Sequence, residues 1–111
     1  MTRSTDFNTT VKHGTRAVQP DLVIYARRAR DNPAGPPKIG LIVARSVGSA
    51  VQRHQLARRL RHVMRDLVPG LEDESHVVVR ALPSSRGSGS DRLAEQLRAG
   101  FGRIRARRSG R

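Results

Sequence analysis

Apolar and basic residues alternate most regularly between positions 47 and 67 of the 111-residue chain. On a helical wheel with ~100° per residue, two sets of side chains in this stretch fall into nearly opposite sectors. The apolar sector holds Leu56, Leu60, Val63, Met64 and Leu67. The opposite sector holds His54, Arg58, Arg61, His62 and Arg65. The pattern predicts an amphipathic helix with one packing face and one cationic face.

The sequence also indicates where this helix begins. Ser49 is followed three positions later by Gln52, which is a capping-box pattern, and Gly48 allows a sharp turn just before it. Free amides in the first turn and the helix dipole attract phosphate, and Arg45 and Arg53 flank this end. The alternatives are a simple cap and a solvated arginine face. Five basic residues on one stripe without acidic partners four residues away favour contact with RNA or DNA.

Two further segments before this helix have regular patterns. A first helix is predicted at Ser4–His13, where Phe7 and Val11 lie four residues apart and Gly14 ends the helix. Two strands are predicted next, at residues 17–18 and 22–26, joined by a turn that contains Pro20. Strand alternation then divides the second strand between two faces. One face carries Leu22, Ile24 and Ala26, and the other carries Val23 and Tyr25.

An almost unbroken apolar run at residues 38–44 predicts a central strand that is covered on at least one face. The connection before it, at 27–37, is polar and rich in proline and glycine. After the long helix, residues 68–70 predict its end, and the valine-rich segment His76–Ala81 predicts another buried strand.

The last third of the chain predicts a flexible loop at residues 83–90 and a final helix capped by Ser90 or Asp91. Its apolar positions recur at helical spacing and are Leu93, Leu97, Phe101 and Ile104. Residues 105–111 predict a frayed basic tail. The order helix, three strands, helix, strand, helix indicates one α/β (α+β) sandwich domain over residues 1–111, with helices packed on one sheet.

The charge of the chain narrows the class of partner. The sequence has 22 Lys and Arg against 9 Asp and Glu, a formal net charge of +13. Self-repulsion at this charge destabilises a compact fold unless a polyanion neutralises it, so a nucleic acid is the expected partner. Heparin-like polymers or anionic membranes would satisfy charge alone. No run approaches the ~18 apolar residues of a membrane span, and we expect a cytoplasmic protein with no membrane partner.

The sequence contains few candidates for catalytic residues. The absence of cysteine excludes disulfides and thiol catalysis. An autonomous nuclease needs a carboxylate cluster for metal ions or histidines paired with a lysine. Glu72, Asp73 and Glu74 follow a helix-terminating turn and predict a solvated loop, and His54 and His62 lie among arginines. The sequence therefore predicts recognition, with no catalytic residue, no protein metal site and no small-molecule substrate.

The few aromatic residues are candidates for stacking on unpaired bases. Phe7 and Tyr25 lie near basic residues, and single-stranded nucleic acid is commonly held by stacking together with cationic backbone contacts. Core packing is the alternative for Phe7. Tyr25 is the stronger candidate because its strand face is opposite to that of Leu22 and Ile24.

Residues 48–61, preceded by 38–46, resemble the signature of the bacterial ribonuclease P protein subunit, an Arg-Asn-Arg motif followed by Lys-Arg-x-x-Arg on one helix. The matching basic positions are Arg53, Arg58, Arg59 and Arg61. The departures from the pattern are Ser49, His54, Gln55 and Ala57. The resemblance extends upstream to Asp6-Phe7 and residues 12–15, and downstream to 76–80, and so covers nearly the whole chain.

This resemblance implies a ribosomal protein S5 domain 2-like fold, a four-stranded mixed sheet in which the third strand, the long helix and the fourth strand form a left-handed crossover. General handedness rules favour the right-handed form. It also implies an accessory subunit of an endoribonuclease that matures the 5′ end of tRNA. The catalytic centre would then be RNA, with Mg²⁺ bound mainly by that RNA.

The resemblance assigns two sets of site residues. Those implied to bind the catalytic RNA are Arg45, Ser46, Ser49, Arg53, His54, Arg58, Arg59, Arg61 and Arg65. Those implied to hold the 5′ leader of precursor tRNA are Phe7, Lys12 and Tyr25. The alternative function is a ribosomal-type RNA-binding or assembly protein without a catalytic partner. A DNA-reading helix ranks third, because such helices usually follow a positioning helix, whereas a strand precedes this one.

Overall fold

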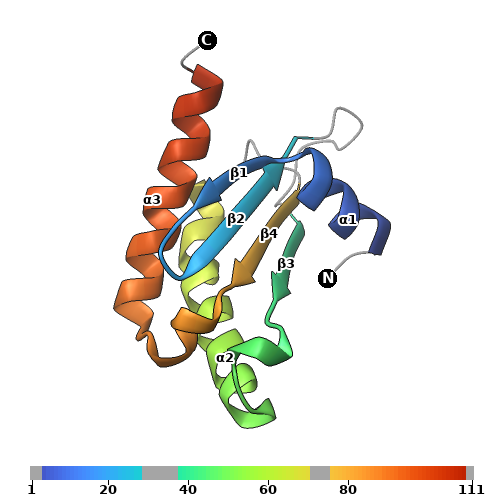
Figure 1. Ribbon diagram of the computed structural model, residues 1–111. Helices are drawn as coiled ribbons and strands as arrows, with labels where there is room; N and C mark the ends of the chain where they lie inside the picture. Colours follow the sequence, from blue (N-terminus) through green and yellow to red (C-terminus); the bar gives the residue numbers. More distant parts are fainter. Residues whose placement is uncertain (1–3, 29–37, 71–75, 110–111) are drawn as a thin grey trace.

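The structure is a computed structural model. It describes residues 4–28, 38–70 and 76–109, with side chains described for 9–28, 38–70 and 76–107. The helices and strands of these ranges follow one another in the predicted order (Figure 1). They are α1 (Ser4–His13), β1 (Thr15–Val18), β2 (Leu22–Arg27), β3 (Lys38–Ile42), α2 (Ala50–Leu67), β4 (His76–Ala81) and α3 (Ser90–Ser109). Short 3-10 helices lie at Arg45–Val47, Val68–Gly70 and Pro83–Gly87.

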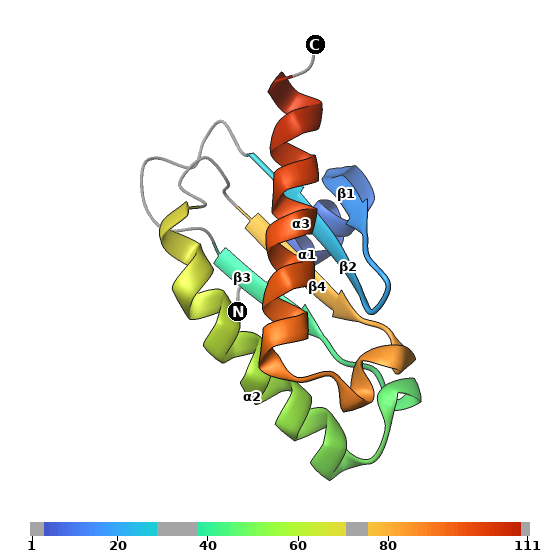
Figure 2. The same ribbon diagram turned by 90° about the vertical axis from the view of Figure 1, so that its left-hand side faces the viewer.

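The four strands form one mixed sheet in the order β1-β2-β4-β3. β2 pairs antiparallel with both β1 and β4, whereas β3 pairs parallel with β4. When the sheet is viewed with α2 toward the reader and β3 and β4 pointing up, β4 lies to the left of β3 (Figures 1 and 2). The β3-α2-β4 crossover is therefore left-handed, as the family resemblance implies and against the general preference for right-handed connections.

Helices cover both faces of the sheet. α2 and α3 lie on one face and α1 lies on the other (Figures 1 and 2). The larger core lies beneath α2 and α3 and includes Leu22, Ile24 and Ala26 of β2. A smaller cluster on the α1 side contains Val23 and Tyr25 of the same strand. The predicted division of β2 between two faces is confirmed.

The prediction of a central strand at residues 38–44 is wrong in its position. β3 ends at Ile42 and lies at the edge of the sheet, and β4 is the central strand beside it. The apolar side chains of this run are covered by packing rather than by a second neighbouring strand. Ile39, Leu41 and Val43 are only partly buried and pack against the core beneath α2. An apolar run indicates that a segment is buried, but it does not indicate which neighbouring strand or helix covers that segment.

The prediction of a flexible loop at residues 83–90 is also wrong. Residues Pro83–Gly87 form a 3-10 helix, and Ser85 and Ser88 are buried. Ser85 Oγ donates a hydrogen bond to the carbonyl oxygen of Leu82 at 2.6 Å, and Ser88 Oγ donates to Oδ2 of Asp21 at 3.1 Å. Serines that resemble linker residues in the sequence act here as buried hydrogen-bond donors.

Asp21 is the polar centre of this region. Its Oδ2 also accepts hydrogen bonds from Nε of Arg92 at 2.6 Å and from Nε2 of Gln96 at 2.7 Å. Burial opposes ionisation of this carboxyl group, but the hydrogen bonds from Arg92, Ser84, Gln96 and Ser88 outweigh it and hold the pKa of Asp21 well below its usual value. The network connects the β1–β2 turn to the first turns of α3.

α3 buries the predicted face, since Leu93, Leu97, Phe101 and Ile104 are all buried. Two predictions about its ends are wrong. The backbone N–H of Leu93 donates to the carbonyl oxygen of Gly89 at 3.1 Å, so Gly89 rather than Ser90 or Asp91 occupies the cap position. The helix continues to Ser109 instead of fraying from Arg105, and Arg105 and Arg107 each donate a hydrogen bond to a backbone carbonyl elsewhere in the fold.

Candidate nucleic-acid interface

The start of α2 has the capping arrangement that the sequence predicts. Ser49 is the N-cap, and its Oγ accepts a hydrogen bond from the backbone N–H of Gln52 at 3.2 Å. Oε1 of Gln52 accepts the backbone N–H of Ser49 at 2.8 Å, which completes the capping box. The 3-10 helix just before it is anchored by buried Val47, whereas Arg45 and Ser46 are exposed. These predicted RNA-binding residues therefore surround the N-terminus of α2.

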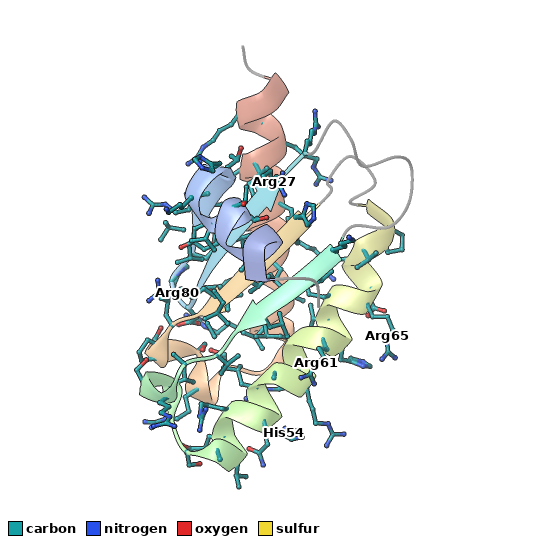
Figure 3. The ribbon with its side chains drawn as sticks, turned by 90° about the vertical axis from the view of Figure 1, so that its right-hand side faces the viewer. Arg27, His54, Arg61, Arg65 and Arg80 are labelled. Carbon is teal, nitrogen blue, oxygen red and sulfur yellow. The ribbon has the colours of Figure 1, made fainter. Side chains whose placement is uncertain are left out.

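The two faces of α2 also match the prediction. Leu56, Leu60, Val63 and Met64 are buried, whereas the residues of the cationic face are exposed (Figure 3). Those exposed residues are His54, Arg58, Arg61, His62 and Arg65. Asp66 is the only acidic residue on the helix. The helix therefore offers a nearly uncompensated positive surface that is attached to a well-packed core.

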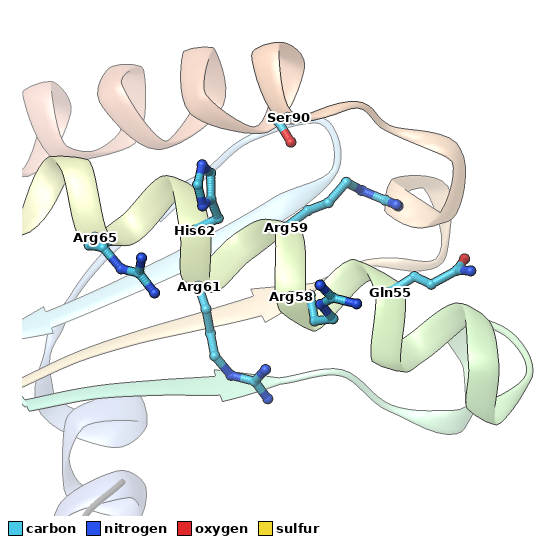
Figure 4. Close-up of a pocket in the computed structure, with 7 residues that line it drawn as sticks. All are labelled: Gln55, Arg58, Arg59, Arg61, His62, Arg65 and Ser90. Atoms are coloured by element: carbon cyan, nitrogen blue, oxygen red, sulfur yellow. The ribbon is translucent and has the colours of Figure 1, made fainter.

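The cationic surface of α2 borders two grooves. The first, the α2–α3 groove, is an open hollow of about 700 Å³ between α2 and the start of α3. It is lined by Gln55, Arg58, Arg59, Arg61, His62, Arg65 and Ser90 (Figure 4). In Figure 4, His62 points toward α3 and Arg59 toward the segment that precedes α3, whereas Arg61 points toward β3. Four of the predicted RNA-binding arginines thus meet at one hollow.

The second groove, the β3–α2 groove, follows the edge strand. It consists of two hollows of about 470 and 320 Å³ that share Leu41 and Arg61. Its remaining lining residues are Ile39, Val43, Ala50, Arg53, His54, Ala57, Met64, Arg65 and Val68. Arg61 borders both grooves, so the predicted RNA-binding residues of α2 form one connected surface along the helix.

Two arginines of this surface have guanidinium atoms that are buried without a hydrogen-bond partner. These atoms are Nε of Arg53 and Nε of Arg59. Nη2 of Arg59 donates to the carbonyl oxygen of Arg86 at 3.4 Å, and a Cβ added to Gly48 would lie 3.0 Å from Cδ of Arg86. Arg86 therefore lies beside the start of α2. The sequence pattern does not indicate this position, because Arg86 belongs to the segment that predicts a flexible loop.

The predicted leader-binding residues belong to the opposite side of the sheet. Lys12 is exposed in the last turn of α1. Tyr25 faces the α1 side as predicted, but its side chain is only 7% exposed and packs with Val23 and Val78. The side chain of Phe7 lies outside the described part of the chain, although its backbone belongs to α1. Tyr25 is thus a packed residue of the smaller cluster in the unbound protein.

The pairing register adds cationic residues to this side that sequence analysis did not single out. Arg27 follows Tyr25 by two positions on β2 and therefore shares its face. Its partner across the sheet is His76, whose Nδ1 lies 3.2 Å from Nη2 of Arg27, and Arg80 is paired with Val23. Figure 3 shows Arg27 and Arg80 toward opposite ends of this face. Only the register of β2 against β4 reveals this arrangement.

Within the described residues, no group of three or more His, Cys, Asp or Glu side chains is placed to hold a metal ion. Glu72, Asp73 and Glu74 lie outside the described ranges. In the part of the chain that the structure covers, no helix has the length and apolar character needed to cross a membrane.

The amino-acid sequence is similar to those of known proteins over nearly its whole length. Residues 1–105 match the family model described as Ribonuclease P. The ribonuclease P protein component of Mycobacterium bovis is 56% identical over 103 residues, which cover 93% of this chain and 86% of that protein. This chain belongs to the ribonuclease P protein family. The corresponding protein of Mycobacterium avium is 54% identical over 99 residues, covering 87% of this chain and 83% of the relative.

Solved structures of ribonuclease P proteins have the same fold. A Staphylococcus aureus RNase P protein mutant with defective mRNA degradation activity superimposes with a TM-score of 0.82 at 16% identity, covering 95% of this chain and 86% of that one. The RNase P protein from Thermotoga maritima gives a TM-score of 0.72 at 20% identity, covering 87% and 89%. At these identities the likeness shows the fold. The family membership confirms the resemblance found in the sequence and does not favour the ribosomal-type alternative.

Proposed function

We propose that this protein is the RNA-binding subunit of ribonuclease P and that it supports 5′ maturation of tRNA by holding a catalytic RNA and its precursor substrate. Membership of the ribonuclease P protein family supports the proposed role in tRNA processing. The connected cationic surface of α2 is the observation that supports RNA binding by this chain, because its arginines are exposed or partly exposed, clustered and almost unopposed by carboxylates.

In this proposal the two sides of the sheet hold different RNAs. The catalytic RNA lies on the α2 side, along the predicted residues Arg45, Ser46, Ser49, Arg53, His54, Arg58, Arg59, Arg61 and Arg65. The 5′ leader of precursor tRNA lies on the α1 side, where Lys12 is exposed and Arg27 and Arg80 share a face with Tyr25. Phe7 belongs to the same proposed contact. The two surfaces lie on opposite faces of one sheet, which allows both RNAs to be held at once.

The bond-breaking step is assigned to the catalytic RNA, with Mg²⁺ bound mainly by that RNA. Phosphate oxygens and water are ligands that Mg²⁺ favours, and RNA supplies them in abundance. The protein contributes fixed positive charge, which neutralises backbone phosphates that would otherwise need metal ions. The expected consequence is a lower Mg²⁺ requirement for cleavage in the presence of the protein.

The test is cleavage of precursor tRNA by the catalytic RNA at low Mg²⁺, with and without the protein. We expect the protein to raise the rate strongly at low Mg²⁺ and weakly at high Mg²⁺. A ribosomal-type RNA-binding protein would bind RNA but leave the cleavage rate unchanged. No stimulation at any Mg²⁺ concentration would therefore overturn the proposed function.

Binding measured as a function of salt gives a second check. Six to nine phosphate contacts predict a log–log slope of about −4 to −8 for the affinity against salt concentration. A slope near zero would contradict the cationic-surface proposal even if the family assignment holds.

A further inference from the structure

The second half of α3 is strongly basic. Arg98, Arg103, Arg105 and Arg107 are all exposed. Glu95, three residues before Arg98, is the last acidic residue of the chain, so no carboxylate follows on α3 to balance Arg103, Arg105 and Arg107. Leu97, Phe101 and Ile104 bury the opposite face against the sheet, which fixes the direction in which the arginines point. These arginines are not part of the RNA-binding set that the sequence predicts.

Two backbone contacts show that the arginines divide between two sides of α3. Nη1 of Arg105 lies 3.5 Å from the carbonyl oxygen of Gly70, just beyond the end of α2. Arg107 donates instead to the carbonyl oxygen of Arg16 on β1, at the other side of the helix. Residues three, four and seven apart share a side of a helix. Arg98 therefore lies with Arg105 on the α2 side, and Arg103 lies with Arg107 on the β1 side.

Arg98 and Arg105 face the helix whose arginines line the α2–α3 groove. α2 and α3 lie side by side on one face of the sheet and run in the same general direction, with Ser90 at the start of α3 opposite the middle of α2, near Arg59 and His62 (Figures 2 and 4). The interval from Arg58 to Arg65 on α2 is seven residues, equal to that from Arg98 to Arg105. At ~1.5 Å per residue, each row extends about 10 Å along its helix. Ser90 is the α3 residue that lines the groove, and the cationic row of α3 begins eight residues further along the helix, so it continues the cationic surface beyond the groove.

The lining of the groove favours a particular form of RNA. It contains arginines, one histidine, a glutamine and a serine, but no Phe, Tyr or Trp on which unpaired bases would stack. Arginine forks suit phosphate oxygens, and base-paired RNA is recognised mainly through its backbone and shape. A groove lined by arginines and without aromatic side chains fits a double-stranded backbone better than a single strand with exposed bases.

We infer that Arg98 and Arg105 of α3 extend the RNA-binding surface beyond the α2–α3 groove, and that this groove holds the phosphate backbone of a base-paired RNA segment. This inference rests on the proposed function, because the base-paired segment belongs to the catalytic RNA. It adds α3 to an RNA-binding surface that the sequence assigns only to α2 and to the residues just before it, Arg45, Ser46 and Ser49. It also names the structural class of RNA that this surface takes.

The chain offers a matched control on the same helix. Arg98→Gln with Arg105→Gln removes two charges and one backbone contact from the α2 side. Arg103→Gln with Arg107→Gln removes two charges and one backbone contact from the β1 side. Both variants have the same net charge, so general electrostatic attraction changes equally. Circular dichroism and melting first establish that each variant is folded.

Affinity for the catalytic RNA is measured by titration over a range of salt concentrations. We expect the Arg98/Arg105 variant to bind roughly tenfold or more weakly and to lose about 1.4–1.8 from the magnitude of its salt slope, as expected for two lost phosphate contacts. The Arg103/Arg107 variant should lose little affinity and keep its slope. Equal losses in the two variants, or no loss at Arg98/Arg105, would overturn the inference.

A second arm tests the form of the RNA with an RNA hairpin and an unstructured RNA of the same length. The Arg98/Arg105 variant should lose affinity mainly for the hairpin, and equal losses for both probes would overturn the base-paired assignment. If the double variant does not fold, Arg98→Gln alone carries the same test with about half the change in slope, because it keeps the Arg105 contact with Gly70. Stimulation of cleavage by the unmodified protein tests the proposed function independently of either result.

Discussion

The two faces of the sheet use their charged and apolar side chains differently. On the face covered by α2 and α3, the arginines point outward from helices whose opposite sides are buried. On the face covered by α1, the aromatic candidate Tyr25 is part of the packed cluster, and Arg27 and Arg80 project from the same strands that form it. The cationic and the packed side chains thus lie on opposite sides of a helix on one face of the sheet, whereas on the other face they project from the same strands.

The difference teaches which substitutions separate binding from stability. A helix segregates its two faces, so a cationic residue can be removed while the core beneath is left intact. On the α1 face, a change in the buried ring alters both the surface and the packing. Substitutions on the cationic face of α2 should therefore change RNA binding without changing stability. Substitutions of Tyr25 should change both RNA binding and stability.

The largest effect is expected at Tyr25. Tyr25→Ala should lower the free energy of unfolding by about 3–5 kcal/mol, because it removes a buried aromatic ring from a small cluster. Urea unfolding measures this loss. Tyr25→Phe is the control, since it keeps the ring and should change stability by less than about 1.5 kcal/mol. A fully stable Tyr25→Ala protein would show that the ring contributes little packing and that the two faces are alike.

The next effect concerns RNA affinity on the α2 face. Arg58→Ala with Arg61→Ala should weaken binding to the catalytic RNA by about 1 kcal/mol or more per lost contact, measured by titration. Its stability should stay within about 0.5 kcal/mol of the unmodified protein per substitution, because both side chains are exposed. Normal RNA binding by this variant, or a large loss of stability, would remove the distinction between the faces.

Asp21, on the α2–α3 side of the molecule, is a charged residue that is itself buried. Its pKa lies below the ordinary value of 3.8 in the folded protein, so the unfolded chain takes up a proton first as the pH falls. The stabilisation is therefore complete above about pH 5 and declines progressively below pH 4. Asp21→Asn should cost about 1–3 kcal/mol at pH 7 through the hydrogen bonds it weakens.

Urea unfolding at pH 7 and at pH 3 measures both effects. The difference in stability between the unmodified protein and Asp21→Asn should shrink at the lower pH. If that difference were the same at both values, another carboxyl group would be responsible for the acid sensitivity.

The smallest effect is expected at the start of α2. Ser49→Ala removes one half of the capping box and should lower stability by about 1 kcal/mol, detected as a lower melting temperature. Ser49→Asp, which keeps a capping oxygen, is the matched control for stability. It places a negative charge where phosphate is proposed to bind, so it should preserve folding but weaken RNA binding. Equal RNA binding by Ser49→Asp and the unmodified protein would exclude phosphate from this helix end.

Much of the candidate site on α2 was predictable because it depends on neighbours in the sequence. The apolar stripe that contains Leu56 and Leu60 follows from a period of 3.6 residues, and Ser49 and Gln52 meet because they are three residues apart. The same reasoning located the buried face of α3 around Leu97. Pairing partners were not predictable in this way, because period-2 alternation states which face a residue occupies but not which strand lies beside it.

The sequence by itself determined the order of the elements, the two faces of α2 and its cap, because these depend on short-range geometry and on the charge of each residue. Only the tertiary structure decided that β3 is an edge strand, that Asp21 meets Ser88 and Gln96 more than sixty residues away, and that Arg105 lies beside Gly70, just beyond the end of α2. The physical reason is that these arrangements are set by long-range contacts. Their free energy comes from packing and from satisfying buried polar groups, which no local pattern contains.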